Sequence, residues 1–513
     1  MVIKGIVKAK MYQDSVKLMR LSSELNSLEG IVDASVIMAT EMNKETLRDV
    51  GLLIPEVENA TPNDLAIVVR ANTEAKAQEA IALAEKLLTS KVVTISQNKQ
   101  TAPRTIGSAV EGLPGANLAL ISVPGLYAAG EALKALNLGL NVHIFSDNVS
   151  LEDEVMLKQA GTQKELLVMG PDCGTAIING IPLAFANVVS KGPIGIVGAS
   201  GTGIQEATIL IDRLGSGISH AIGTGGRDLS DAVGGLMMLM GIDCLESDEQ
   251  TKVILLISKP AGEKTTIKII ERIQKCKKPV IICLMKGKLD AARTGATLAA
   301  TIEDAVYKAV ALASDEEPRP IPENYWGSFS EQATSLRKQL KTQQKYIRGL
   351  FTGGTLADEA MVVMRSLIGD VYSNIPLNPD FGLENSRFSK KHTIVDLGDD
   401  EFTQGKPHPM IDPTPRNERF IQEYADPEVA VLLCDVVTGY GSHANPASEL
   451  VQALKKARTL YPMNNPVVVA FVCGTPSDPQ PLNEQTSILE NAGIIVLPSN
   501  AAAARFAVQI VNP

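Results

Sequence analysis

The sequence lacks the patterns that build metal sites, disulfide frameworks and membrane spans. Its 513 residues include six cysteines, none of them in C-x-x-C spacing, so neither a zinc site nor a disulfide framework is indicated. No apolar run reaches the roughly eighteen residues of a membrane-spanning helix, and Met1 is not followed by a basic-then-apolar leader. We therefore expect a reduced, cytoplasmic protein without a bound metal.

Two common nucleotide-binding signatures are also missing. The glycine spacing from Gly198 to Gly203 is G-x-x-G-x-G, which is neither the dinucleotide fingerprint nor a P-loop. The formal charge of −10 and the isoelectric point near 5.3 argue against nucleic acid or an anionic membrane as a partner. Any local anion binding must then come from backbone amides and a few placed basic groups.

The chain does contain two stretches of one design: a short apolar strand, a glycine-rich turn and an amphipathic helix. They run over residues 192–215 and 346–369. A helix that begins in this way points unpaired backbone N–H groups and the positive end of its dipole at whatever lies in front of it. Each stretch alone is equally consistent with a tight βα connection. Two such helices from different halves of the chain, however, can face one anionic group from opposite sides.

Strand and helix signals alternate along the chain, which predicts an α/β protein of several domains. We expect a small α+β domain of ferredoxin-like type at 1–100, which would serve docking or oligomer formation. A Rossmann-like domain is expected at 101–188, and the family resemblance given below implies that it is of the CoA-binding type. Doubly wound parallel sheets of flavodoxin-like type are expected at 189–313 and 346–513, joined by an acidic, proline-rich linker and a helix at 314–345.

Ligands of parallel sheets bind beyond the carboxyl ends of the strands. That rule gives a candidate substrate crevice, formed by Pro124, Gly125, Ser146, Asp147, Asn148, Asp172, Cys173, Gly225 and Gly226. Arg227 directly follows the last glycine pair and is the basic residue that we expect to act. Lys286, Lys288 and Arg293 form a further basic loop.

A polar, turn-rich segment at 391–419 contains His392 and His408 among several aspartates. No recognised ligand spacing relates them, so a solvated or partner-facing loop is favoured over a metal site. We expect Cys173 and Cys473 to be small buried residues rather than reactive ones.

Several motifs resemble a known family. GPDCGTAIING, KGPIGIVGASGTGIQEA and GISHAIGTGGRD are similar, in order and spacing, to the central part of the α subunit of succinyl-CoA synthetase. FTGGTLADEA and the strands after it resemble a domain of that enzyme's β subunit. The whole arrangement is similar to the FdrA family over nearly the full length.

The resemblance implies a phosphate site at the two helix starts, formed by Ser200, Gly201, Thr202, Gly203, Gly353, Gly354 and Thr355. The synthetase carries a phosphorylated histidine in a GHAGA-type loop, where this chain reads KLDAARTGATLAA without histidine. No ATP-grasp domain and no clear CoA phosphate loop before Gly112 are found. Asp172 stands where the synthetases tend to have asparagine.

The FdrA resemblance implies a subunit of an oxamate carbamoyltransferase in anaerobic allantoin catabolism, with Arg227 and Asp172 as catalytic candidates. Such a reaction needs positioning and stabilisation of the leaving phosphate, not a covalent protein intermediate. We expect small anionic substrates, other protein subunits and a homo-oligomer as partners, and the reaction requires no cofactor. Two alternatives stay open: an acyl-CoA synthetase that uses CoA and a partner subunit, and a non-catalytic scaffold with an anion site.

Overall fold

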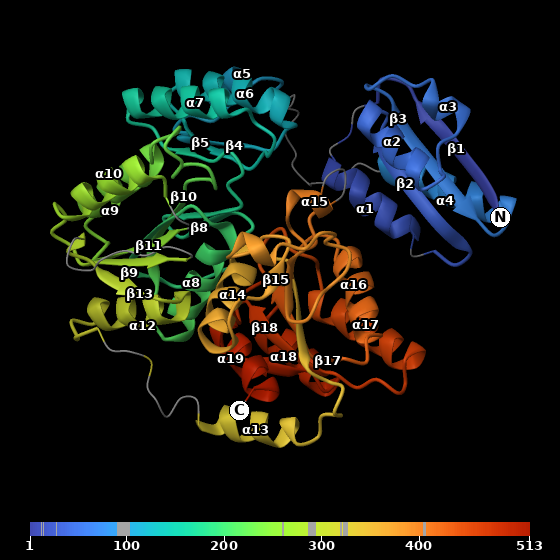
Figure 1. Cartoon of the computed structure of the whole chain (residues 1–513). Coiled ribbons are helices and arrows are strands. Elements are labelled where there is room, and N and C mark those ends of the chain that lie inside the picture. Colours follow the sequence, from blue (N-terminus) through green and yellow to red (C-terminus); the bar gives the residue numbers. More distant parts are fainter. Residues whose placement is uncertain are drawn as a thin grey trace. The chain divides into compact units, whose positions relative to one another are not determined.

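The computed structural model describes residues 1–11, 13, 15–26, 28–89, 103–258, 261–285, 294–318, 321, 327–403 and 407–512, and every structural statement below concerns them. The chain divides into two compact units (Figure 1). The first is Met1–Ala102 with Thr403–Pro407, and the second is Pro103–Phe402 with His408–Pro513.

The N-terminal unit is a three-stranded antiparallel sheet in the order β1-β3-β2. Its central strand β3 is almost wholly buried, with α1 and α4 packed on one face and α2 and α3 on the other. This confirms the small α+β domain, with three strands in the relation that ferredoxin-like folds show. Its elements are β1 (Val2–Lys8), α1 (Ser15–Asn26), β2 (Ile31–Met38), α2 (Glu41–Asp49), α3 (Pro55–Glu58), β3 (Leu65–Ala71) and α4 (Glu74–Thr89).

The second unit begins with a small parallel sheet in the order β4-β5-β6. Its helix α7 begins at a side-chain cap, in which Ser150 accepts a hydrogen bond from the Asp153 N–H, and three acidic residues fill the first turn. The elements are α5 (Ile106–Gly112), β4 (Leu118–Ile121), α6 (Gly125–Asn137), β5 (Asn141–Ile144), α7 (Leu151–Lys164) and β6 (Val168–Met169).

A seven-stranded sheet in the order β13-β12-β11-β9-β10-β7-β8 forms the central domain. Strands β9 and β11 are near-continuous apolar runs, as strands covered on both faces require. Helices α8 and α12 cover one face, and α9 and α10 cover the other. The elements are β7 (Thr175–Ile178), β8 (Ile181–Ala184), β9 (Lys191–Gly198), α8 (Gly201–Arg213), β10 (Ile218–Gly223), α9 (Leu236–Ser247), β11 (Val253–Ser258), α10 (Glu263–Ile273), β12 (Val280–Leu284), β13 (Thr297–Ala299) and α12 (Ile302–Ala313).

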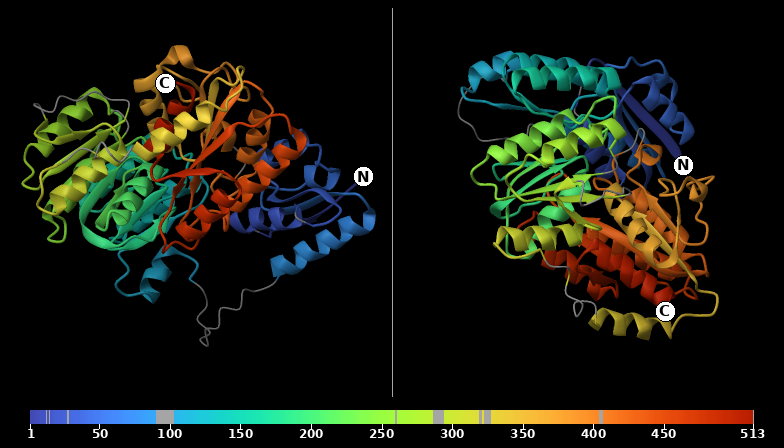
Figure 2. Two further views of the ribbon diagram at one scale, coloured as in Figure 1. Left: turned by 90° about the horizontal axis from the view of Figure 1, so that it is seen from below. Right: turned by 60° about the vertical axis from the view of Figure 1, so that its left-hand side comes forward.

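The C-terminal domain is a six-stranded parallel sheet in the order β15-β16-β14-β17-β18-β19. Helices α14 and α19 cover one face, and α16, α17 and α18 cover the other (Figures 1 and 2). The elements are α13 (Gly327–Arg337), β14 (Tyr346–Phe351), α14 (Gly354–Ile368), β15 (Tyr372–Ser373), a 3₁₀ turn (Pro379–Phe381), β16 (Thr393–Asp396), α15 (Asp400–Thr403), α16 (Thr414–Tyr424), β17 (Val429–Val437), α17 (Pro446–Leu460), β18 (Val467–Cys473), α18 (Leu482–Asn491), β19 (Ile495–Leu497) and α19 (Asn500–Val511).

Two features differ from the pattern-based expectation. The hairpin β7–β8 pairs with β10, so the central sheet begins before residue 189, where we placed the start of that domain. Within the polar segment 391–419 lies the buried strand β16, which pairs with β14. It is only four residues long, too short for its apolar pattern to stand out against the polar residues on both sides.

The central and C-terminal domains repeat one plan. Their strand orders β13-β12-β11-β9-β10 and β19-β18-β17-β14-β16 correspond, with α8 matching α14 and α12 matching α19. The matched helices lie on the facing sides, where a single apolar cluster contains residues of all four. The two domains therefore share one core across an approximate two-fold relation.

Polar groups fix the same junction. Arg213 at the end of α8 donates hydrogen bonds to the carbonyl oxygens of Val472, Gly474 and Pro498. The buried Asp478 carboxylate accepts hydrogen bonds across it from Val188 N and Asn187 Nδ2, both at 2.7 Å.

Replacing Asp478 should show how much these polar contacts contribute to the free energy of unfolding, separately from the apolar core. Asp478→Ala also removes the acceptor for Thr475 N and Thr438 Oγ1. It should lower the free energy of unfolding by about 3–5 kcal/mol, because each buried donor left unsatisfied costs about 1–3 kcal/mol. Urea unfolding of the full chain measures this. The exposed Glu249, replaced by alanine as a control, should change stability by less than about 0.5 kcal/mol.

Candidate functional site

The two glycine-rich turns meet where the central and C-terminal domains face each other. Ser200 caps α8 by accepting a hydrogen bond from the Gly203 N–H at 3.2 Å. Its hydroxyl is also hydrogen-bonded to the Thr355 hydroxyl in the first turn of α14. Gly353 has no capping side chain, and a Cβ at that position would lie 2.9 Å from the Thr202 methyl carbon. The N-termini of α8 and α14 are therefore in direct contact.

The contacts follow the two-fold relation of the domains. Ser200, Thr202 and Glu206 on α8 occupy the positions that Gly353, Thr355 and Glu359 occupy on α14. Ser200 touches Thr355, and Gly353 touches Thr202. All seven residues predicted to bind phosphate thus lie together, in the segments that we call the paired helix starts, Ser200–Gly203 and Gly353–Leu356. Their role in binding phosphate stays a prediction.

The paired helix starts retain unused hydrogen-bond donors. The first intrahelical bonds are made by the N–H groups of Ile204 and Ala357. The N–H groups of Gly201 and Thr202 on α8, and of Gly354 and Thr355 on α14, therefore lack an intrahelical acceptor. Both helix dipoles point their positive ends into the same place, so the arrangement suits a small anion with several oxygen atoms.

A buried carboxylate makes the two helix starts unequal. Asp435, at the end of β17, accepts hydrogen bonds from Thr352 N and Gly353 N, each at 2.8 Å, and from the Thr352 hydroxyl. Burial raises the pKa of Asp435, while Arg416 and these donors act in the opposite direction. The turn before α14 is thus held by an internal carboxyl group. The corresponding residue of the central domain is the apolar Ile257, a difference that sequence patterns do not reveal.

Behind the paired helix starts lies a fully buried pair of carboxyl groups. Glu206 Oε1 accepts a hydrogen bond from Asn500 N at the start of α19, and Glu359 Oε1 accepts one from Ile302 N at the start of α12. Burial, and then the neighbouring Glu359, raise the pKa of Glu206 well above its usual value. Burial also raises the pKa of Glu359 and brings that of nearby Glu303 to about 7.

The predicted substrate crevice forms at the carboxyl ends of β4 and β5. Ser146 Oγ accepts the Val123 N–H, and Ser146 O accepts the Asp172 N–H, each at 3.0 Å. A Cβ on Gly125 would lie 2.3 Å from the Asp147 carbonyl oxygen, so Pro124 and Gly125 pack directly on Asp147 and Asn148. The structure brings these residues together as expected.

Three other crevice residues come from neighbouring segments. A Cβ on Gly225 would lie 2.3 Å from the Pro171 carbonyl oxygen, and one on Gly226 would lie 3.9 Å from Asp172 Oδ2. Cys173 is buried, and burial raises its pKa to about 12. Its thiol is therefore protonated at neutral pH, and burial likewise raises the pKa of Cys473.

Arg227 is half-exposed and contacts the edge of a buried ion network. Its Nε lies 2.8 Å from Glu154 Oε2, and its Nη2 donates a hydrogen bond to the Val149 carbonyl oxygen. Lys158, which has no exposed surface, pairs with Glu154 and with Asp228. Asp228 in turn accepts the N–H groups that start α9. The guanidinium thus ties the glycine loop to α7, and a catalytic role for Arg227 requires that the substrate reach it there.

The remaining basic candidates, Lys286, Lys288 and Arg293, lie outside the described residues. Among the residues that are described, no group of three or more histidine, cysteine or acidic side chains is placed to hold a metal ion. None of the helices described combines the length and apolarity needed to cross a membrane.

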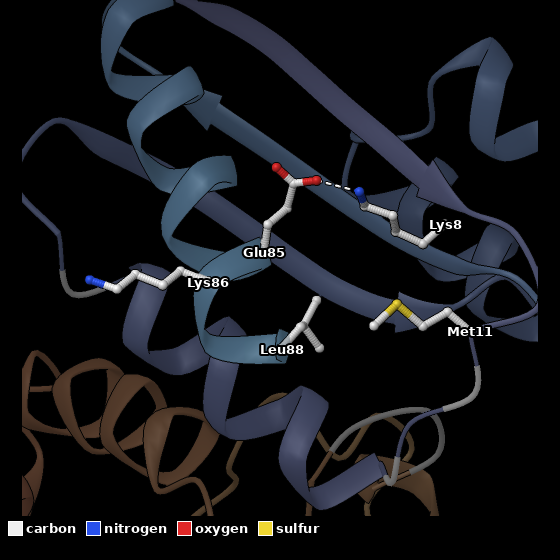
Figure 3. A pocket seen from close by; sticks show the side chains of 5 residues that line it. All are labelled: Lys8, Met11, Glu85, Lys86 and Leu88. Atoms are coloured by element: carbon white, nitrogen blue, oxygen red, sulfur yellow. Dashed lines mark ion pairs between the residues drawn. The ribbon is translucent and has the colours of Figure 1, made fainter. Parts of the chain in front are cut away.

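Figure 3 shows a cavity of about 310 Å³ in the N-terminal unit, lined by Lys8, Met11, Glu85, Lys86 and Leu88. Lys8 and Glu85 form an ion pair across it, and Met11 and Leu88 add apolar surface. Lys86 adds a second positive side chain to the lining, and these five residues offer no arrangement of nucleophile and base.

Family models match three parts of the chain. Residues 1–104 match the "AllF, heavy metal-associated domain", residues 189–283 the CoA binding domain and residues 350–510 the CoA-ligase. The matched domains define a protein of the succinyl-CoA ligase α-like class with an AllF-type N-terminal domain. The first 104 residues contain no cysteine and no histidine, so the thiolate and imidazole ligands that commonly hold a heavy metal are absent from them.

The chain belongs to the family of the uncharacterized protein YahF of Escherichia coli K12, to which it is 47% identical over 505 residues, covering 98% of this chain and 97% of YahF. The succinate–CoA ligase α subunit of Aquifex aeolicus is 30% identical over 186 residues, which cover 32% of this chain and 60% of that subunit. A dinucleotide-forming acetyl-coenzyme A synthetase 1 of Ca. Korarchaeum cryptofilum overlaps 78% of this chain and 84% of its own at 17% identity, with a TM-score of only 0.33.

A substitution at Gly201 tests the anion site. A Cβ there would meet Thr175 Oγ1 at 3.4 Å and Gly174 Cα at 3.5 Å, so the fold accommodates a side chain that fills the approach to the helix N–H groups. Gly201→Val should weaken phosphate binding at least about tenfold, read from the rise in melting temperature with phosphate. Gly130→Val, at a helical glycine with open space around it, should leave that rise unchanged. Equal rises in both variants would contradict the site.

The buried carboxyl pair should make stability depend on pH. Glu206 keeps its proton in the folded state to a higher pH than in the unfolded state, where it ionises near 4.5. The folded state therefore loses stability as pH rises above about 4.5 toward the raised pKa. Glu206→Gln should gain stability over the wild type between pH 5 and pH 8, by about 1.4 kcal/mol for each unit of pKa difference. Urea unfolding at both pH values measures this, and Glu249→Gln, at an exposed position, should show no such gain.

Proposed function

We propose that this chain is an FdrA-like subunit of an oxamate carbamoyltransferase, which interconverts carbamoyl phosphate plus oxamate with oxalurate plus phosphate. The observation that carries the proposal is the contact between two helix N-termini whose first N–H groups are free to bind phosphate oxygens. The AllF-type domain at residues 1–104 supports the assignment to allantoin catabolism.

In this reaction the amide nitrogen of oxamate attacks the carbamoyl carbon. The bond from that carbon to the phosphate oxygen breaks, its electron pair leaves with phosphate, and the amide proton passes to this leaving group, which departs as the hydrogen phosphate dianion. The free N–H groups of Gly201, Thr202, Gly354 and Thr355 stabilise the negative charge that collects on the leaving phosphate. No group of the chain needs to form a covalent bond.

The acceptor is proposed to lie in the crevice between Gly125 and Asn148. Arg227, at the rim of that crevice, would orient the oxamate carboxylate, and Asp172 would hold its amide group. Asp172 is in the left-handed region, with a φ of 53°, and its N–H is bound by Ser146. That backbone geometry fixes the position of its carboxylate beside Gly226.

A CoA-dependent ligation is the second candidate, because two of the matched models are CoA-binding and CoA-ligase domains. CoA would bind at the start of α6, where Leu126 and Tyr127 are exposed side chains of the kind that an adenine ring contacts. When bound, CoA supplies a thiol that accepts an acyl group. Partner subunits would be required for either reaction, and a scaffold that only binds an anion is the third candidate.

The assay that separates these candidates uses the full chain together with the proteins that copurify with it from its own host. We expect carbamoyl phosphate and oxamate to yield oxalurate and phosphate in equal amounts, and no ³²P to stay on the chain. Thioester formation from CoA, ATP and a dicarboxylate would instead establish the ligase. Phosphate binding without either reaction would favour the third candidate, a scaffold that only binds an anion.

A further inference from the structure

One histidine of the segment 391–419 lies close to the turn before α14. His408 Nδ1 accepts a hydrogen bond from the Met410 N–H at 3.2 Å. Because a neutral imidazole carries its proton on the nitrogen that does not accept, this bond places the proton of His408 on Nε2. Among the described residues, Nε2 has no hydrogen-bond partner.

The neighbourhood of Gly398 locates that Nε2 atom. A Cβ on Gly398 would lie 2.7 Å from His408 Nε2, 2.8 Å from the Thr352 carbonyl oxygen and 3.2 Å from Asp396 Oδ1. Thr352 opens the turn into α14, and a Cβ on Gly354 would lie 2.5 Å from Asp396 Oδ2. His408 therefore stands at the carboxyl end of β16, beside the start of α14.

The other side of the imidazole faces the central domain. Its ring centroid lies 5.9 Å from that of Phe185. Phe185 O accepts a hydrogen bond from Thr175 Oγ1 at 2.6 Å, and Thr175 borders Gly201 at the start of α8. Phe185 also packs on Phe145, the residue before Ser146 of the crevice, at 5.4 Å. The imidazole thus packs on Phe185 of the central domain, at the end of a row of rings that leads from the crevice toward the turn before α14.

We propose that His408 is a catalytic residue of the carbamoyl transfer, and that its neutral Nε2–H donates a hydrogen bond to the carbamoyl oxygen as the acceptor nitrogen attacks. The inference rests on the proposed function. As the carbonyl carbon becomes tetrahedral, its oxygen takes up negative charge, which a positioned donor stabilises more than it stabilises the ground state.

The environment keeps this donor neutral. Burial lowers the pKa of His408 to about 4, so the ring is uncharged at physiological pH. A neutral donor does not form an ion pair with the phosphate of the bound substrate. Its hydrogen bond instead goes to the carbamoyl oxygen, on which negative charge develops. The same tautomer argues against a phosphorylated His408, because Nδ1 is occupied and Nε2 carries the proton.

Substitutions at His408 and His392 test this role. His392 has a similar environment, since its Nδ1 accepts the Ile347 N–H and burial brings its pKa to about 4. It precedes β16, at the end of that strand remote from the helix starts. In the complete transferase, His408→Ala should lower kcat about 100- to 1000-fold with little change in KM for carbamoyl phosphate. His408→Gln, which keeps a donor near the Nε2 position, should recover part of the loss, and His392→Gln should behave as wild type.

The pH profile and labelling complete the test. The loss in His408→Ala should be constant from pH 5.5 to 8, since the wild-type imidazole does not titrate in that range. An unchanged kcat in His408→Ala, a loss that follows a titration, or ³²P bound to His408 would overturn the inference. If both His408 variants lost the phosphate-induced rise in melting temperature, His408 would have a structural role, and the inference would again be overturned. A wild-type complex that transfers no carbamoyl group would overturn the proposed function together with the inference.

Discussion

Two helix N-termini in contact pose an electrostatic problem, because each carries about half a positive charge and several N–H groups without acceptors. Much of the second unit is arranged around that contact between α8 and α14. The hydroxyls of Ser200 and Thr355 form a hydrogen bond across this contact, and the carboxyl group of Asp435 accepts hydrogen bonds from the turn before α14. The donors that remain point toward one place, which is why the contact is suited to a phosphate.

One helical turn further into the core, two carboxyl groups lie close together, and helix N-termini stabilise them. Glu206 and Glu359 bring two carboxyl groups together in the core, where one of them must keep its proton. The N-termini of α19 and α12 supply N–H groups to them. Each domain thus offers one helix N-terminus to the carboxyl of the other, and the junction is held by matched polar contacts as well as by the shared apolar core.

The family relation and the site fit each other. The start of α8 lies in the part that matches the CoA binding domain, and the start of α14 lies in the part that matches the CoA-ligase model. The loop that carries a histidine in the succinyl-CoA synthetases that this chain resembles carries none here. His408 arrives instead from the loop after β16, in a tautomer suited to donating a hydrogen bond. On the proposed function, a change of reaction needs only such an exchange of groups beside the paired helix starts, because the fold itself sets the position of these helix starts.

The sequence by itself determined the α/β class, the small N-terminal domain, the two strand–turn–helix units and the strand-end crevice. These features depend on local periodicity and on glycine spacing, and both can be read from residues that are close together in the sequence. It also indicated that the two helix starts share one ligand. Only the tertiary structure decided that Asp435 occupies one turn, that Glu206 meets Glu359, that Arg227 pairs with Glu154 and that His408 lies beside α14. Each is a contact between side chains on different secondary-structure elements, and a local pattern carries no information about which distant residue the fold will bring to it.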